Sequence, residues 1–229
     1  MAGHPDQPGP DTMTLDFAKA REAMVEQQVR PWDVLDPRVL DVLLRLPREA
    51  WAPAAHRALA YADLALPLAH GESMLKPVVE GRALQALALE GSEDVLEIGT
   101  GSGFTAACLG RLARSVTTIE RHEDLATAAQ ATLLAQGATS VSTVHADAFA
   151  WEPGRQFDVI LVGGAVDAIP DRFLGWLRPG GRMFIVRGRA PAMEAVLVHA
   201  DVNGPRIESL FETDLAYLAG AAPVPAFAF

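Results

Sequence analysis

The sequence predicts a doubly wound, Rossmann-like α/β fold, in which a seven-stranded, mostly parallel sheet follows an N-terminal helical and loop extension. After residue 94, short apolar runs alternate with helical segments, a pattern typical of parallel strands joined by helical crossovers. The first of these runs leads directly into glycines at alternate positions. We divide the chain into an extension expected to be disordered, a helical and loop region, and the α/β core, at residues 1–13, 14–92 and 93–229.

Three helices are expected in the N-terminal region. Pro31 should end the first, because the residue before a proline is disfavoured in a helix. Asp36 can cap the second, and Pro37 suits its first helical position. Residues 51–76 carry prolines and aromatic residues without a clear period, which predicts an irregular segment. The expected helices cover residues 14–30, a stretch that begins at residue 37, and residues 78–89.

Five apolar runs mark the strands of the core, and two weaker ones follow them. The fourth run is apolar almost throughout, as expected for a strand buried on both faces. The helices between strands are expected at residues 104–112, 125–136 and 173–177. The strands are expected at residues 95–98, 116–119, 141–144, 157–162, 183–186, 195–200 and 207–211.

Composition narrows the classes of partner. The formal net charge is −10 at pH 7, so a nucleic-acid partner or an anionic membrane surface is disfavoured. Cys108 is the single cysteine, which excludes an intramolecular disulfide, and its helical spacing with Phe104 and Leu112 predicts a buried thiol. The histidines lack metal-ligand spacing, so no metal site is expected. With no signal-like N-terminus and no membrane-length apolar run, we expect a cytoplasmic protein.

A glycine-rich turn joins the first strand of the core to the next helix, within Val95-Leu96-Glu97-Ile98-Gly99-Thr100-Gly101-Ser102-Gly103. Without side chains, the backbone can turn sharply there, and a ligand can lie against the main chain. Glycine spacing alone leaves several interpretations open. The run from Gly101 to Ala106 fits the looser dinucleotide pattern, which would indicate a nicotinamide-dependent oxidoreductase. A tight strand-to-helix connection without a ligand is the simplest alternative.

Three acidic residues help to separate these interpretations. Glu97 stands two residues before the first glycine, where dinucleotide-binding folds usually keep an apolar residue. Glu120 ends the second strand, placed to accept hydrogen bonds from both ribose hydroxyls of an adenosine. Asp147 follows the third strand, placed to accept from an adenine amino group. S-adenosylmethionine carries an adenosine and a cationic sulfonium but no pyrophosphate, so three carboxylates favour it over NAD.

Together, these features resemble the class I S-adenosylmethionine-dependent methyltransferases over roughly residues 94–186. The runs Phe157–Val162 and Leu177–Arg182 resemble the family's fourth strand and the turn into its fifth. The resemblance implies S-adenosylmethionine as cofactor and S-adenosylhomocysteine as its product. The implied cofactor-binding residues are Met74, Leu75, Glu97, Gly99, Thr100, Gly101, Ser102, Gly103, Glu120, Arg121, Asp147 and Ala148.

The N-terminal region narrows the resemblance. Its series of short motifs is similar in order and spacing to the protein-L-isoaspartate O-methyltransferases, at residues 24–28, 36–40, 47–49, 60–63 and 66–68. The resemblance implies methylation of the misplaced carboxylate of isoaspartyl residues, the first step of protein repair. The implied partner is an isoaspartyl-containing protein or peptide, or a small carboxylate. Two alternatives stay open: a methyltransferase of the same fold with another acceptor, and a homologue that binds the cofactor without catalysis.

One loop departs from the family pattern. The family has a stretch of the form Gly-Gln-Thr-Ile-Ser-x-Pro, whose serine is considered functionally important. Here Glu72 stands at the glutamine position, Leu75 at the serine position, and Val78 where a histidine often follows the proline. Ser73 is the candidate substitute hydroxyl, and therefore the candidate catalytic residue, with a plain loop serine as the alternative. We expect residues 61–76 to cover the sulfonium end of the cofactor.

Overall fold

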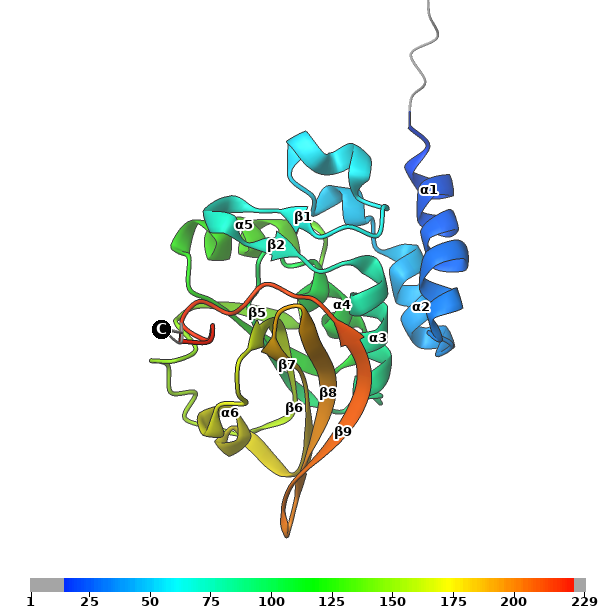
Figure 1. The fold of residues 1–229 in the computed structure, drawn as a ribbon. Helices are drawn as coiled ribbons and strands as arrows, with labels where there is room; N and C mark the ends of the chain where they lie inside the picture. Colours follow the sequence, from blue (N-terminus) through cyan, green and yellow to red (C-terminus); the bar gives the residue numbers. More distant parts are fainter. Residues whose placement is uncertain (1–14, 225–229) are drawn as a thin grey trace, which may run out of the picture.

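The computed structural model describes residues 15–224 and contains a seven-stranded sheet in the order β5-β4-β3-β6-β7-β8-β9 (Figure 1). The four strand pairs from β5 to β7 are parallel, and the two pairs from β7 to β9 are antiparallel. The predicted Rossmann-like, mostly parallel sheet is therefore confirmed. The strands are β3 (Asp94–Ile98), β4 (Ser115–Glu120), β5 (Val141–His145), β6 (Phe157–Val166), β7 (Leu177–Arg189), β8 (Ala192–Asp201) and β9 (Gly204–Thr213).

Two apolar layers enclose the sheet, because successive side chains of a strand point to opposite faces. Val95 and Val159 pack in the layer that contains α3, α4 and α5. Their neighbours Leu96 and Ile160 pack in the opposite layer, with Phe173 of α6. β3 is buried along its whole length, as expected for a parallel strand covered on both faces. The helices are α3 (Pro77–Leu87), α4 (Phe104–Leu112), α5 (Glu123–Ala135) and α6 (Asp171–Gly175).

The N-terminal region forms a helical layer beside α3 (Figure 1). The predicted end of its first helix before Pro31 is wrong. The chain stays helical through Pro31, because this proline lies in the first turn of a short 3-10 segment, where its missing N–H is not required. The predicted cap of the second helix is confirmed, since the Asp36 side chain accepts from the Arg38 N–H at 2.8 Å. The segments are α1 (Phe17–Met24), a π-helical turn (Val25–Val29), a 3-10 turn (Arg30–Trp32) and α2 (Pro37–Arg45).

α3 contacts this helical layer at Gly81. A Cβ at this position would lie 2.9 Å from Val29 Cγ1 and 3.4 Å from Val34 Cγ2. Glycine therefore leaves room for the Val29 and Val34 side chains to pack against α3.

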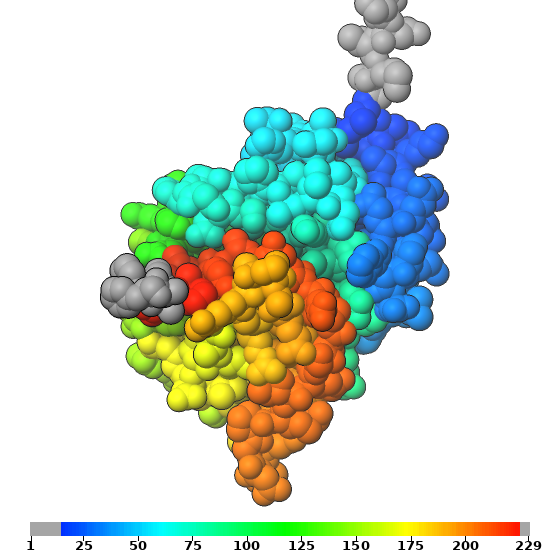
Figure 2. Space-filling view, in the orientation of Figure 1, coloured from blue at the N-terminus to red at the C-terminus, as the bar shows by residue number. Residues whose placement is uncertain are grey.

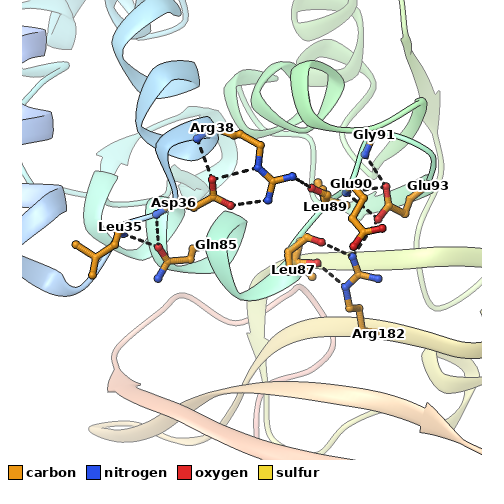
Figure 3. A network of polar contacts seen from close by, with 11 residues as sticks. Leu35, Asp36, Arg38, Gln85, Leu87, Leu89, Glu90, Gly91, Glu93 and Arg182 are labelled. Carbon is orange, nitrogen blue, oxygen red and sulfur yellow. Dashed lines mark hydrogen bonds and ion pairs between the residues drawn. The ribbon is translucent and has the colours of Figure 1, made fainter.

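Polar contacts join the N-terminal layer to the core around α3 (Figure 3). The Gln85 side chain accepts hydrogen bonds from the N–H groups of Leu35, at 2.5 Å, and Asp36, at 2.9 Å. Arg38 donates to the Leu89 carbonyl at 2.6 Å. The backbone groups that lie between helices are thus satisfied by side chains. On the other side of α3, the network reaches β7 through Arg182, which contacts Glu93 and the carbonyls of Leu87 and Ala88.

The segment between α2 and α3 is irregular, as predicted. β1 and β2 pair with each other antiparallel and lie outside the main sheet. In Figure 2, this segment, in cyan, lies beside the C-terminal segment after β9, in red. Its short elements are 3-10 turns at Arg48–Ala50, Ala54–Leu59 and Ala69–Gly71, with β1 at Leu66–Pro67 and β2 at Ser73–Met74.

The chain around α6 differs from the prediction. Residues 177–182 lie at the start of β7, but the register with β6 passes from Phe157↔Leu177 to Val159↔Arg182. Residues 178–181 therefore form an irregularity within the strand, where Gly180 has a φ of 78°. The chain can remain in the sheet because Gly181 has no Cβ, which would lie 2.9 Å from the Asp158 carbonyl oxygen. The expected helix at residues 173–177 ends at Gly175. The predicted extension at residues 1–13 lies outside the described residues, and the proposed division of the chain at residue 93 stays a prediction.

Within residues 15–224, no helix is long and apolar enough to cross a membrane. Cys108 is buried in α4, as its spacing predicts.

Candidate active site

Two cavities meet at Gly99, at the carboxyl ends of the parallel strands. Strand order reverses beside β3, between β4 and β6, and open α/β sheets bind ligands at such a point. The first cavity lies over the ends of β3 and β4 and the loop after β5. The second lies between the glycine turn and β2.

The glycine turn is built as the sequence predicts. Gly99, Gly101 and Gly103 all have positive φ angles, of 95°, 52° and 87°. Residues other than glycine rarely adopt such φ angles. The Gly99 N–H donates to the Ile119 carbonyl at 2.9 Å, which ties the turn to β4. A Cβ on Gly101 would lie 3.1 Å from Leu68 Cδ1, so the irregular segment approaches this turn closely.

Glu120 connects the end of β4 to the glycine turn. Its carboxylate accepts from the Gly101 N–H at 2.9 Å and from the His122 N–H at 3.0 Å. Both bonds hold the side chain against the first cavity, which it lines. A carboxylate held in this way can accept ligand hydroxyl groups without a large loss of side-chain entropy.

Glu97 lies at the floor of the second cavity and is 1% exposed. Its carboxyl accepts from the Thr118 hydroxyl at 2.6 Å, and Thr118 also contacts the Thr100 hydroxyl at 2.6 Å. Burial raises the pKa of Glu97 to about 8, and the carboxylates of Glu80 and Glu120 add to the increase. A cation that enters the cavity would favour the ionised form of this group.

Asp147 and Arg121 stand at the rim of the first cavity. Asp147 Oδ1 accepts from the Phe149 N–H at 2.8 Å, and Oδ2 lies 3.9 Å from an Arg121 guanidinium nitrogen. The Asp147 side chain is 42% exposed, so it remains accessible to an amino group of a bound ligand. Ala148 lines the same cavity and is buried.

The second cavity is walled by β2 and the residue after it. Ser73, Met74 and Leu75 all line it; Met74 and Leu75 are buried, and Ser73 is half-buried. Glu80 of α3 completes this wall. Among the described residues, none that lines this cavity is basic. Its electrostatic character therefore suits a cationic ligand rather than a pyrophosphate.

A roof of loop residues closes over the first cavity. Glu72 lines the cavity and lies 3.5 Å from the His122 ring nitrogen Nε2. The His70 and His122 rings stack at 4.1 Å between centroids, and His70 Nε2 lies 2.9 Å from Asp124. From the other side, Leu218 lines the cavity. Segments far apart in the sequence thus cover one site.

The predicted site residues separate into two groups. Those at the first cavity are Gly99, Glu120, Arg121, Asp147 and Ala148. Those at the second are Ser73, Met74, Leu75, Glu97, Gly99, Thr100, Gly101 and Ser102. Gly103 lines neither cavity; a Cβ there would lie 3.2 Å from Trp51 and 3.3 Å from Ala129, so its position is one of close packing.

Among the residues around the cavities that sequence reasoning missed are Arg48, Glu80, Thr118 and Leu218. Glu80 has a local signal in the sequence, because a carboxylate stands there among apolar residues of α3. Arg48, Thr118 and Leu218 are brought to the site by contacts between distant segments.

The glycine turn, the strand-end carboxylates and the lack of basic residues in the second cavity define the class. The protein is a Rossmann-like enzyme whose site fits an adenosine-containing cofactor with a cationic end, as S-adenosylmethionine has. A model of the family described as protein-L-isoaspartate(D-aspartate) O-methyltransferase matches residues 19–217. The chain therefore belongs to this family of S-adenosylmethionine-dependent enzymes.

Relatives and a solved structure agree with this membership. Protein-L-isoaspartate O-methyltransferase 1 of Rhodopseudomonas palustris (strain HaA2) is 38% identical over 207 residues, which cover 89% of this chain and 84% of the relative. The Koribacter versatilis enzyme is 38% identical over 199 residues, 86% of each chain. A crystal structure from Plasmodium falciparum, assigned to the same enzymes and bound to S-adenosyl-L-homocysteine, has a TM-score of 0.76 at 17% identity. It covers 86% of this chain and 97% of its own, and shows the shared fold.

Proposed function

We propose that this protein binds S-adenosylmethionine across the two cavities and methylates the carboxylate of isoaspartyl residues in damaged proteins. The observation that carries the proposal is the meeting of the cavities at Gly99. Glu120 and Asp147 offer acceptors for the adenosine in the first cavity, and Glu97 offers a carboxyl group for the cationic end in the second. The predicted cytoplasmic location stays a prediction.

S-adenosylmethionine, when bound, supplies an electrophilic methyl group on its sulfonium. An acceptor carboxylate is ionised at neutral pH, because its ordinary pKa is about 4. The chain therefore needs no general base to generate the nucleophile. The work of its residues is to hold the acceptor oxygen in line with the methyl group and to exclude water. The wall formed by Ser73, Met74 and Leu75 suits that task, and Ser73 is the hydroxyl proposed to orient the acceptor.

Leu75 at the family's serine position predicts a slow isoaspartyl reaction. Its side chain is buried and cannot bond to a carboxylate. One missing hydrogen bond to a charged group amounts to about 1.5–3 kcal/mol, or roughly tenfold to a hundredfold in rate if it forms in the transition state. We expect measurable but poor methyl transfer by the natural protein and a faster reaction by Leu75→Ser. The measurement is incorporation of labelled methyl into isoaspartyl and aspartyl peptides.

Leu64→Ser, an exposed change in the same segment, is the matched control and should leave the rate unchanged. If neither the natural protein nor Leu75→Ser labels the isoaspartyl peptide above the aspartyl one, repair is the wrong function. The second candidate function, methyl transfer to a different acceptor, would then be favoured. The second cavity is lined by the buried carboxyl groups of Glu80 and Glu97, which do not favour a carboxylate as the acceptor.

A further inference from the structure

A buried ion pair stands behind the wall of the second cavity. Arg48 and Glu80 lie 2.7 Å apart, and each side chain is 1% exposed. Removing two charges from water is so costly that a buried pair is weak evidence for a stabilising role. The position of the pair therefore points to a different role.

Arg48 contacts the main chain of the cavity wall directly. Its second guanidinium nitrogen donates to the Leu75 carbonyl at 2.5 Å, and the guanidinium lies 4.9 Å from the centre of the Phe104 ring. Glu80 in turn accepts from the Thr105 hydroxyl at 2.6 Å. The pair thus joins the 3-10 turn at residues 48–50, the end of β2, α3 and the start of α4.

The groups held by the pair are those that face the cavity. Leu75, Glu80, Phe104 and Thr105 line the second cavity, whereas Arg48 does not. Arg48 therefore supports the wall from behind. A guanidinium can do this because its planar fork donates in two fixed directions at once, here to Glu80 and to the Leu75 carbonyl.

We propose that Arg48 and Glu80 are positioning residues for methyl transfer, which hold the main chain at Leu75 and thereby the acceptor side of the second cavity. The inference rests on the proposed function for the reaction it serves. Methyl transfer depends on alignment, and a displacement of about 1 Å by a mutation away from the chemistry can slow a reaction by about a hundredfold.

The pair also acts on Glu97. The Glu80 carboxylate is among the groups that raise the pKa of Glu97, together with burial and Glu120, while the hydroxyl of Thr118 lowers it. Removal of the Glu80 charge should therefore lower the pKa of Glu97. The pH profile of cofactor binding should then shift to lower pH, an effect that a merely structural role of the pair would not produce.

The test compares Arg48→Met/Glu80→Gln with the natural protein. The double variant avoids an unpaired buried charge, and the new amide can still bond to Thr105. Arg48→Lys keeps the charge but not the two-directional fork. Arg21→Met is the matched control, because Arg21 forms an ion pair with Glu49 in the same region and lines neither cavity.

Three measurements are made on each folded variant: calorimetric affinity for S-adenosylhomocysteine over pH 6–9, steady-state methyl transfer to an isoaspartyl peptide, and hydrogen exchange of residues 66–76. For the double variant we expect an affinity within about threefold of the natural value at the optimal pH, and kcat/KM for the acceptor reduced about tenfold or more. Exchange at residues 66–76 should be faster. Arg48→Lys should be intermediate, and Arg21→Met unchanged.

Unchanged exchange and unchanged kcat/KM in the double variant would overturn the proposal. A loss of cofactor affinity as large as the loss of turnover would also overturn it, because the pair would then serve cofactor binding. If the natural protein fails to methylate the isoaspartyl peptide, the proposed function is wrong. The exchange and affinity data still decide the positioning role, since they need no acceptor: faster exchange with unchanged affinity supports it, and unchanged exchange contradicts it.

Discussion

At the residue scale, Glu97 is the group whose chemistry depends most on its surroundings. Burial raises the pKa of Glu97 to about 8, and a hydrogen bond from Thr118 at 2.6 Å only partly offsets the increase. At neutral pH, the side chain is therefore mostly neutral before a ligand enters. Binding of a cationic cofactor end should favour ionisation and release a proton near pH 7.

The same pKa predicts how stability depends on pH. The folded-state pKa of about 8 lies above the unfolded value of 4.5, so the unfolded state binds fewer protons between these limits. The contribution of Glu97 is fully present below pH 4.5 and is lost as pH rises through about 8. The slope is at most about 1.4 kcal/mol per pH unit. We expect Glu97→Gln to flatten the fall in unfolding free energy between pH 5 and 8, as measured with denaturant.

Glu123→Gln provides the control, since Glu123 is exposed in the first turn of α5. It should leave the slope as in the natural protein. An equal slope in the natural protein and in Glu97→Gln would show that Glu97 does not hold its proton in the folded state.

At the scale of elements, the roof over the first cavity is a contact between two loops. The turn at residues 69–71 meets the start of α5 through the stacked rings of His70 and His122. Each ring also has a carboxylate partner, Asp124 for His70 and Glu72 for His122. Because polar contacts between partly exposed side chains hold this roof, it is suited to open and close over a ligand.

We expect His122→Ala to accelerate release of S-adenosylhomocysteine, because it removes both the ring stack and the contact with Glu72. The loss of about 0.5–1.5 kcal/mol corresponds to roughly two- to tenfold in dissociation rate. Rapid-mixing displacement of a bound fluorescent analogue measures this rate. His199→Ala, in β8 and paired with Glu208, is the control. A dissociation rate equal in all three proteins would show that the roof does not limit exit.

At the scale of the whole molecule, the N-terminal helices support the cavity wall through α3. The close approach at Gly81 and the polar network around Gln85 fix this layer in place (Figure 3). Arg48 lies in the turn after α2 and forms its ion pair with Glu80, the residue before Gly81 in α3. The position of the N-terminal layer should therefore depend on its polar contacts with α3.

Gln85→Ala tests this connection. The change leaves the N–H groups of Leu35 and Asp36 without their side-chain acceptor, at a cost of about 1–3 kcal/mol. We expect a lower unfolding free energy and faster hydrogen exchange over residues 15–46. Gln156→Ala removes a single exposed bond to the Gly175 carbonyl and should alter neither. Exchange that is unchanged over residues 15–46 in Gln85→Ala would contradict the linking role.

Local sequence patterns predicted an element correctly where a single local signal, such as a helix cap or an apolar run, was enough to specify it. The Asp36 cap, the glycine turn and the buried β3 and β6 follow from side-chain chemistry within a few residues. The errors arose where the tertiary structure overrode a local signal. Pro31 remained inside a helical segment, and the glycines at residues 180 and 181 became part of β7, because each found a backbone position that tolerates it.

The strand-end acids were foreseeable for the same reason: Glu97, Glu120 and Asp147 each lie in or just after a recognisable strand. By itself, the sequence determined which strands carry or precede the acidic residues of the site, where the glycine turn that a cofactor can approach lies, and the family to which the chain belongs. Only the tertiary structure decided that Arg48 lies behind Leu75, that His70 stacks on His122, and that Leu218 covers the first cavity. Periodicity and capping act over a few residues, whereas these contacts join segments 27 or more residues apart, whose distance is set by packing of the whole chain.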